Sequence, residues 1–350
     1  MRYPGIVLLL VGLVLLLGCC GGDLGRSHPA PSDFEMEISL PATPAKEQGK
    51  WPAGWIYATL GMVESDRLAV GDSLRLSASY LVRMRCEELL EKNLAEGGRN
   101  IKAHDFAATP FHCLDLLEKN GTLVHATFRP HLYTSWAACR SALNAKSLRS
   151  NEARMRNFMD TVFSFVPNAV ALYGAVYSPH DLMRSVLREN SYEGFRTALL
   201  RWDADARPDS LLPEALQERY KVIAPDSACS LMLSTLRAGH SLVWMGDTIG
   251  DDFSTARRTA VAHGPKKAAG ASRPSLPRPL PVSQMQALHI VGTARPKALS
   301  RAICTDGSSL FFVAQLPHKD ATGQAVRFYL SENYVRNHTA AIYRLSPRFW

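Results

Sequence analysis

The chain has only seven cysteines, and a long stretch near its start contains none. No cysteine lies between Cys20 and Cys86, and no two of the seven are spaced as C-x-x-C. The cysteine spacings match no common zinc pattern, and Asp247, Asp251 and Asp252 are not spaced as in an EF-hand loop, so we expect no metal ion and no cofactor. We expect the later cysteines to be mostly buried, with at most one or two disulfides: Cys86, Cys113, Cys139, Cys229 and Cys304.

Acidic residues are missing from residues 256–282, which carry six Lys or Arg side chains and five prolines. The whole chain has a formal charge of +8, so this one stretch accounts for most of the excess. The remainder is nearly neutral and gives no sign of a basic face, so no nucleic-acid partner is expected. We expect residues 256–282 to form a basic, proline-rich loop or linker.

Long apolar runs are also scarce, and the one at residues 6–17 is short for a membrane span. It follows Arg2 and precedes Gly18 and Cys19, which is typical of an export signal. The stretch Leu16-Leu17-Gly18-Cys19 resembles the lipobox of bacterial lipoproteins. This resemblance implies a signal peptide over 1–18, a lipid on Cys19 and a flexible tether over 19–44. An uncleaved anchor and an ordinary cleaved signal remain alternatives.

Helical and strand-like patterns divide the rest of the chain into two parts. Helical spacing dominates up to about residue 236, and β-branched and aromatic segments dominate from residue 240. The expected helices span 54–64, 74–94, 110–119, 179–188 and a segment that Asp226 caps and that ends near Gly239. The expected strands span 241–245, 287–293, 310–315, 325–330 and 340–345. The sequence therefore predicts an α+β domain over 45–350.

One segment carries a recognisable motif. It reads Gln48-Gly49-Lys50-Trp51-Pro52-Ala53-Gly54-Trp55 and continues with Ile56, Tyr57 and Ala58. It resembles the papain-like cysteine peptidases, in which Gln-Gly leads after a short interval to the nucleophilic cysteine and then to Trp. The resemblance is closest to the bleomycin hydrolase or aminopeptidase C branch, in particular its lipoprotein versions. It implies a helical N-terminal half packed on a barrel-like β half, with the cleft between them.

The same resemblance assigns the positions of the other catalytic groups. In the family the histidine opens a strand that ends in Val-Gly, and here Gln286 opens the strand that ends in Val291-Gly292. The orienting asparagine ends an aromatic strand, and here Gln315 stands at that place. The nucleophile position is Gly54. All three catalytic positions are therefore substituted, while Gln48, Gly49, Trp55, Tyr57 and Ala58 match the family pattern, and Gln48 and Trp55 would be remnants of the former site.

These substitutions exclude the usual mechanism. Glycine offers no nucleophile and a carboxamide does not titrate near neutral pH, so neither an acyl-enzyme nor proton transfer is available there. Three residues from Gln286, His289 points to the opposite face of the strand and is expected to be structural. His112 and Cys113 are adjacent on a helix and point in different directions, so they too are expected to be structural.

The sequence therefore favours an inactive, papain-like pseudopeptidase over an enzyme. We expect a peptide or protein partner in the former cleft, which Trp51, Trp55, Gln286 and Gln315 would line, or else a structural role. The lipid on Cys19 would hold the protein in the envelope of a Gram-negative bacterium, on the periplasmic or the surface face of the outer membrane. The alternatives are an active thiol-dependent aminopeptidase and a subunit that complements an active paralogue. The sequence predicts no oligomeric state.

Overall fold

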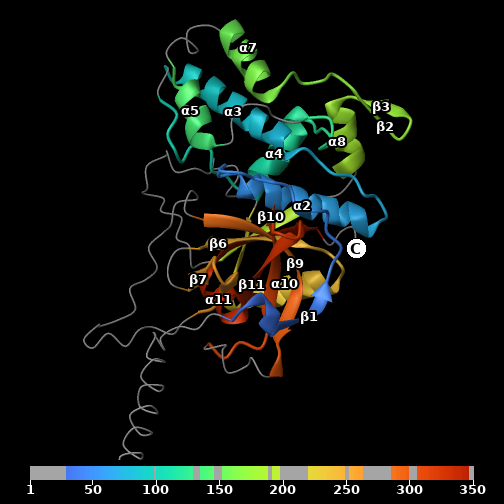
Figure 1. Ribbon diagram of the computed structural model, residues 1–350, viewed down its shortest axis with the longest axis vertical. Helices are drawn as coiled ribbons and strands as arrows, with labels where there is room; N and C mark the ends of the chain where they lie inside the picture. The colour runs from blue at the N-terminus through green and yellow to red at the C-terminus, as the bar shows by residue number, and fades with distance from the viewer. Residues whose placement is uncertain are drawn as a thin grey trace, which may run out of the picture.

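Most of the helices gather at one end of the molecule and most of the strands at the other, with α2 between them (Figure 1). The computed structural model describes residues 29–97, 100–128, 135–145, 152–187, 191–197, 220–248, 252–262, 285–298 and 306–346. The expected signal peptide, Cys19, residues 263–282 of the basic stretch and Cys304 lie outside these ranges. The α+β class expected from the sequence is confirmed.

The helical end is built from segments whose starts carry local signals. Ser77 Oγ accepts from Tyr80 N and begins α3, and Thr109 begins α4 with Pro110 at the first helical position. Helix α4 ends at Gly121, which has a φ of 78° and lies against Pro179, where a side chain would collide with backbone. The helices of this part are α2 (Gly54–Ala69), α3 (Ala78–Ala95), α4 (Pro110–Asn120), α5 (Trp136–Leu143), α7 (Glu152–Phe163) and α8 (Pro179–Leu187).

The other end is a mixed sheet of ten strands among the described residues. Its hydrogen-bonded order is β5-β4-β12-β6-β9-β10-β11-β8-β7, and β1 pairs with β9 beside this path. Its strands are β1 (Phe34–Ser39), β4 (Tyr192–Thr197), β5 (Tyr220–Ile223), β6 (Leu242–Asp247), β7 (Phe253–Ser254), β8 (Thr259–Ala260), β9 (Met285–Pro296), β10 (Phe311–Lys319), β11 (Ala325–Ser331) and β12 (Thr339–Leu345). Helices α10 (Pro225–Arg237) and α11 (Glu332–His338) lie at this end, and β2 (Val170–Leu172) and β3 (Ala175–Tyr177) form a separate hairpin.

Strand β1 corrects the expected tether over 19–44. It pairs antiparallel with β9, with Phe34 opposite Pro296 and Ser39 opposite Gly292. A Cβ at Gly292 would lie 2.1 Å from Ile38 O, so the two strands approach as closely as they do because residue 292 has no side chain. The described fold therefore begins by Phe34, earlier than residue 45.

Two further expectations need correction. Asp226 is not the cap of α10, because Ala224 holds that position and Pro225 is the first helical residue. The stretch 256–282 is not entirely loop, since β8 lies within it and pairs in parallel with β11. The first described residues reach this strand, because Thr259 Oγ1 donates to Pro29 O at 3.0 Å.

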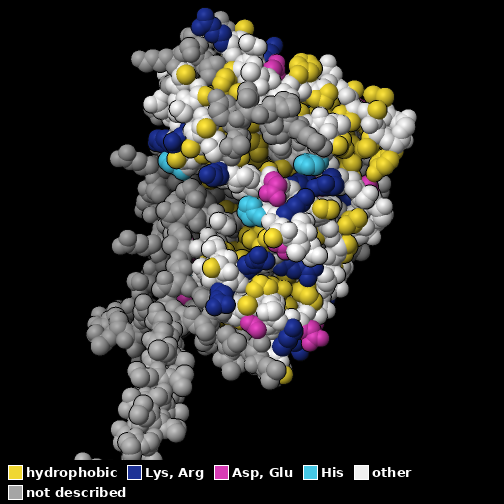
Figure 2. All heavy atoms as spheres, viewed as in Figure 1, with side chains coloured by type: hydrophobic (Ala, Val, Ile, Leu, Met, Phe, Trp, Pro, Cys, Tyr) yellow, Lys and Arg dark blue, Asp and Glu magenta, His cyan; other side chains and the backbone are white. Residues whose placement is uncertain are grey.

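Helix α2 packs on β9 and joins the two ends of the molecule. Its residue Gly61 faces His289, where a Cβ would lie 2.6 Å from Nδ1, so the helix can pack this closely only with glycine at this position. Apolar side chains remain exposed on Phe165, Tyr173 and Val176, and in Figure 2 yellow side chains gather at the upper right edge, where Figure 1 places the β2–β3 hairpin.

No helix in the described ranges is both long and apolar enough to cross a membrane.

Candidate functional site

A groove of about 560 Å³ lies where the two ends of the molecule meet. One wall comes from the segment that leads into α2 and from residues 107–108, and the other comes from the sheet and its loops. The helical wall includes Gln48, Trp51, Pro52, Gly54 and Trp55. The sheet wall includes Met245, Thr248, Phe253, Thr255, Arg258, Met285, Gln286, Ala287, Leu288, Leu316, Pro317, His318, Val326 and Phe328. Of the six residues that the sequence assigned to the former cleft, five line this groove and Gln315 does not: Gln48, Trp51, Gly54, Trp55 and Gln286.

Gly54 is the first residue of α2 and lies at the groove. A Cβ there would have Ala287 O at 3.6 Å and Gln48 Oε1 at 4.0 Å as its nearest neighbours. These are ordinary contact distances, so the backbone leaves room for a side chain that would point between Gln48 and β9. The helix N-terminus has the position that a nucleophile needs, and it holds only a hydrogen atom.

Gln48 forms hydrogen bonds within the protein. Its Nε2 donates to Trp51 O at 2.5 Å, and its backbone N donates to Pro317 O at 3.3 Å. The oxygen of the amide, rather than its N–H, is the atom nearest to the Gly54 side-chain site. An oxyanion would need a donor aimed at this point, so the arrangement does not form an oxyanion hole through Gln48.

The two glutamines that the sequence analysis placed at the other catalytic positions do not contact each other. Gln286 is exposed in the groove, and across the sheet it pairs with Gly246 of β6. Gln315 pairs with His289, not with Gln286, and its Nε2 donates to Thr43 O at 2.7 Å. Gln315 does not line the groove and so does not orient Gln286.

His289 lies in the core, as its strand position predicts. The ring is 4% exposed, and Nε2 lies 2.9 Å from Ser241 Oγ and 3.5 Å from Ser65 Oγ. Burial, together with the nearby charge of Lys46, lowers the pKa of His289 to about 3. The imidazole is therefore neutral at physiological pH and faces away from the groove, so it cannot act as a base there.

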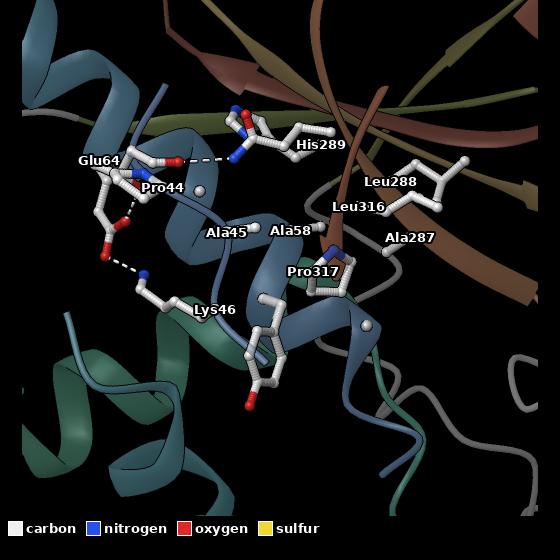
Figure 3. Close-up of a pocket in the computed structure, with 15 residues that line it drawn as sticks. Pro44, Ala45, Lys46, Ala58, Glu64, Ala287, Leu288, His289, Leu316 and Pro317 are labelled. Carbon is white, nitrogen blue, oxygen red and sulfur yellow. Dashed lines mark hydrogen bonds and ion pairs between the residues drawn. The ribbon is translucent and has the colours of Figure 1, made fainter. Parts of the chain in front are cut away.

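A second hollow, of about 30 Å³, lies behind Gly54 and holds a buried ion pair (Figure 3). Lys46 Nζ pairs with Glu64 Oε1, and their side chains are 6% and 1% exposed. Glu64 also accepts from Thr43 Oγ1 and, at 2.5 Å, from Leu76 N. Burial lowers the pKa of Lys46, although the Glu64 carboxylate opposes the shift. This volume is that of about one water molecule, so the hollow is not a ligand site.

Aromatic side chains build both walls of the groove. Trp51 is half-buried, and its ring centroid lies 5.6 Å from that of Phe106 and 6.0 Å from that of Trp136. Trp55 is 4% exposed, and its Nε1 has no acceptor among the described residues. On the opposite wall Phe253 and Phe328 stack with centroids 4.4 Å apart. The groove thus offers large apolar surfaces of the kind that bind peptide side chains.

The described cysteines lie away from the groove and are buried, as expected: Cys86, Cys113, Cys139 and Cys229. None of them forms a disulfide with another described residue. Burial raises the pKa of Cys229 to about 12 and raises those of Cys86 and Cys113 as well. These thiols are protonated at neutral pH, so none is an activated nucleophile.

The charged residues in the described ranges form no metal site in addition to the groove. No group of three or more His, Cys, Asp or Glu side chains that could hold a metal ion occurs there. Asp247 and Asp252 instead flank His338, at 3.8 and 3.9 Å, and Asp251 lies outside the described ranges. His112 contacts Glu88 at 2.8 Å and packs on Trp55, which is a structural role.

Arg258 and His318 belong to the groove, although the motif did not point to them. Arg258 lies in the turn between β7 and β8, and His318 lies at an irregularity in the pairing of β10 with β11. Nothing in the sequence around the turn or around the irregularity indicates that either lies near Gly54. Only the fold brings them to the same surface.

A helical part, a sheet part and a groove that opens at the start of the helix between them define the papain-like fold, which the comparison with solved structures supports. The chain is similar to PepW from Lactobacillus rhamnosis HN001, with 13% identity and a TM-score of 0.64, over 100% of this chain and 93% of that one. Xylellain, a cysteine protease from Xylella fastidiosa, matches with 11% identity and a TM-score of 0.44, over 92% of this chain and 90% of that one.

At these identities the likeness to PepW shows the fold alone, and the likeness to xylellain is too weak to carry an argument. No protein-family model matches the sequence. No curated protein matches it either.

Proposed function

We propose that the protein is a catalytically inactive, papain-like pseudopeptidase that binds a peptide or an extended segment of a protein in the groove. The observation that carries this proposal is the presence of glycine at position 54, the first residue of α2. The chain keeps the groove, the helix N-terminus and the space for a side chain, but it has no nucleophile at that point. The neutral Gln286 amide beside it supplies no base.

The remaining parts of the groove support binding without chemistry. Gln48 donates within its own segment, Gln315 donates to Thr43 O, and every described cysteine is buried away from the groove. Trp51 offers a large apolar surface, and Gln286 is exposed and can exchange hydrogen bonds with a peptide backbone. Loss of the nucleophile alone costs on the order of 10⁶ in turnover in the best-studied catalytic triad, so partial activity is not expected.

The binding experiment uses the full chain purified in detergent. Internally quenched peptides report hydrolysis, and the same sequences with a neutral fluorophore report binding by anisotropy. We expect binding without turnover, and weaker binding in Trp51→Ala and in the groove-filling variant Thr255→Trp. Tyr173→Ala removes an exposed aromatic ring far from the groove and serves as the control. Turnover that disappears when a single cysteine is alkylated would instead identify an active thiol peptidase.

We further propose that a lipid on Cys19 holds the protein in the cell envelope, on the periplasmic or the surface face of the outer membrane. The short apolar run at 6–17 and the Leu-Gly-Cys sequence support this proposal. Cells fed a labelled fatty acid should label the wild-type chain and not Cys19→Ser. Cys20→Ser is the matched control and should keep its label. Equal labelling of Cys19→Ser and wild type contradicts the anchor.

A complementing subunit of an active paralogue is a different outcome of the same work. It predicts that the chain is recovered from its own membrane together with an active peptidase. Peptide binding by the recovered complex would then be due to the active peptidase, so Trp51→Ala in this chain would leave it unaffected.

A further inference from the structure

Positive charge faces the groove, and no acidic side chain lines it among the described residues. Of the residues that line it, Arg258 and His318 are the basic ones, and the polar remainder consists of Gln and Thr amides and hydroxyls. The first turn of α2 adds to this field, because Ala53 caps the helix without a side-chain hydrogen bond. A carboxylate that enters the groove therefore meets Arg258 and the positive end of α2, and no carboxylate is among the described residues that line the groove.

Arg258 is held in place through its backbone rather than through its side chain. Its φ of 59° lies in the left-handed region, and its carbonyl accepts from Tyr329 N at 2.9 Å. The next residue, Thr259, pairs with Tyr329 in β8 and is fully buried. The turn at 255–258 is thus fixed to the sheet at its C-terminal end, while Arg258 itself stays partly exposed.

The guanidinium of Arg258 remains available to a ligand. Within the described residues it makes no hydrogen bond or ion pair at short range, in contrast to Arg83 and Arg344, which are paired with carboxylates at 2.7 Å. Its described electrostatic neighbour is Asp320, a partly exposed residue whose pKa is lowered chiefly by hydrogen bonding from Thr322 and least by Arg258. Exposed charges of this kind interact weakly in water.

From these observations we infer that the groove selects peptides that carry a carboxylate, with Arg258 as the residue that recognises it. This inference rests on the proposed peptide-binding function and adds the chemical class of the ligand. An apolar residue of the peptide packs against the Trp51 side, and the carboxylate lies against the Arg258 side, where a planar guanidinium can donate two parallel hydrogen bonds. The carboxylate comes from an Asp or Glu side chain or from a free C-terminus.

The test uses the full chain and peptides in matched sets. Each set shares an apolar residue and a neutral fluorophore and has three members: an internal Glu with an amidated end, Gln in its place with an amidated end, and Gln with a free C-terminal carboxylate. We expect the Glu or the free-carboxylate member to bind roughly tenfold more tightly than the neutral member, which corresponds to one charge-assisted hydrogen-bonded contact. Added salt should reduce this preference.

Arg258→Gln should abolish the preference, and the binding of the neutral member that remains shows that the variant is folded. Arg258→Lys keeps the charge and should retain part of the preference. Arg257→Gln removes the same charge from the neighbouring, exposed residue that does not line the groove, and it should retain the whole preference.

Equal binding of all three members by the wild type, still weakened by Trp51→Ala, overturns the carboxylate inference and leaves the peptide-binding function standing. A preference that Arg257→Gln removes as fully as Arg258→Gln also overturns it, because net charge and not the groove would then be responsible. Failure of every member to bind overturns the peptide-binding function itself.

Discussion

Lys46 and Glu64 form an ion pair that is almost completely withdrawn from water, with side-chain exposures of 6% and 1%. The carboxylate also accepts from Leu76 N and Thr43 Oγ1, so one side chain of α2 ties down the chain on both sides of it. We expect Glu64→Ala to lower the free energy of unfolding by about 3–5 kcal/mol, because it leaves a buried cation and a backbone N–H without partners.

Denaturant unfolding followed by circular dichroism measures this loss. Glu47→Ala is the matched control, since Glu47 is exposed and nearby in sequence, and its replacement should change the free energy by less than about 0.5 kcal/mol. Equal effects of the two substitutions would mean that the buried pair does not stabilise the fold.

His289 predicts a specific acid sensitivity. Its pKa is lowered to about 3 in the folded protein by burial, whereas an unfolded histidine titrates near 6.5. Between these values the unfolded state binds the additional proton, so the stability falls as the pH falls from about 6.5 toward 3, by about 5 kcal/mol in all.

The stability of wild type and of His289→Gln should therefore converge as the pH falls through this window. Other buried groups titrate as well, notably Asp66, whose pKa is raised by burial, and the difference between the two proteins removes their contribution. His104→Gln replaces an exposed imidazole and should keep the wild-type pH profile. A parallel profile for His289→Gln and wild type contradicts the assignment.

Gly54→Cys tests whether the groove still offers the environment of a nucleophile. The Cβ fits without a close contact, and a thiol at the first residue of α2 should have a pKa below the usual value of about 8.5 because of the helix dipole. The rate of iodoacetamide labelling at residue 54 against pH, read by mass spectrometry, gives this pKa.

Ala107→Cys also lines the groove but lies outside the helices, so it provides a thiol of ordinary reactivity for comparison. We expect no peptide hydrolysis from Gly54→Cys alone, because Gln286 supplies no base, and faster acylation by an activated ester in Gly54→Cys/Gln286→His. If residue 54 labels more slowly than residue 107 at every pH, the helix N-terminus does not face the groove as described.

Gly292→Ala should loosen the first strand. The new methyl group would lie 2.1 Å from Ile38 O, so β1 must move away from β9, and we expect a loss of about 1–3 kcal/mol from this overpacking. Limited proteolysis should then cut within 34–39 faster than in wild type. Gly54→Ala, where the methyl group meets nothing closer than 3.6 Å, should resist proteolysis as wild type does. The idea fails if both variants are cut at the same rate.

The sequence predicted where α2 begins but not where it ends. Residues 54–64 are apolar on most sides, and this local pattern is sufficient to predict a buried helix. The last turns contain Glu64, Asp66 and Arg67, which look like an exposed end of a helix. They are buried because Lys46, Tyr192 and Asp72 provide partners. Asp72 directly follows the helix, but Lys46 and Tyr192 come from segments whose contact with α2 has no local signal.

Strand β1 was missed for a related reason. It is six residues long, follows a proline-rich stretch and pairs with residues more than 250 positions later, which local patterns do not reveal. The segment that contains β1 was expected to be a tether, so it offered no partner for Gln315, which was assigned to the former cleft. The partner of this amide is Thr43 O, in the segment expected to be a tether, so the amide points there and not toward Gln286.

The pairing of β1 with β9 determines how the molecule would bear a mechanical load. A pull on Phe34 directed along β1 would load the backbone hydrogen bonds between β1 and β9 together rather than one after another. Strand β9 passes the force to β6 and β10, which flank it in the middle of the sheet. A tension along β1 would thus pass into the middle of the sheet, where β9 also supports α2 and with it one wall of the groove.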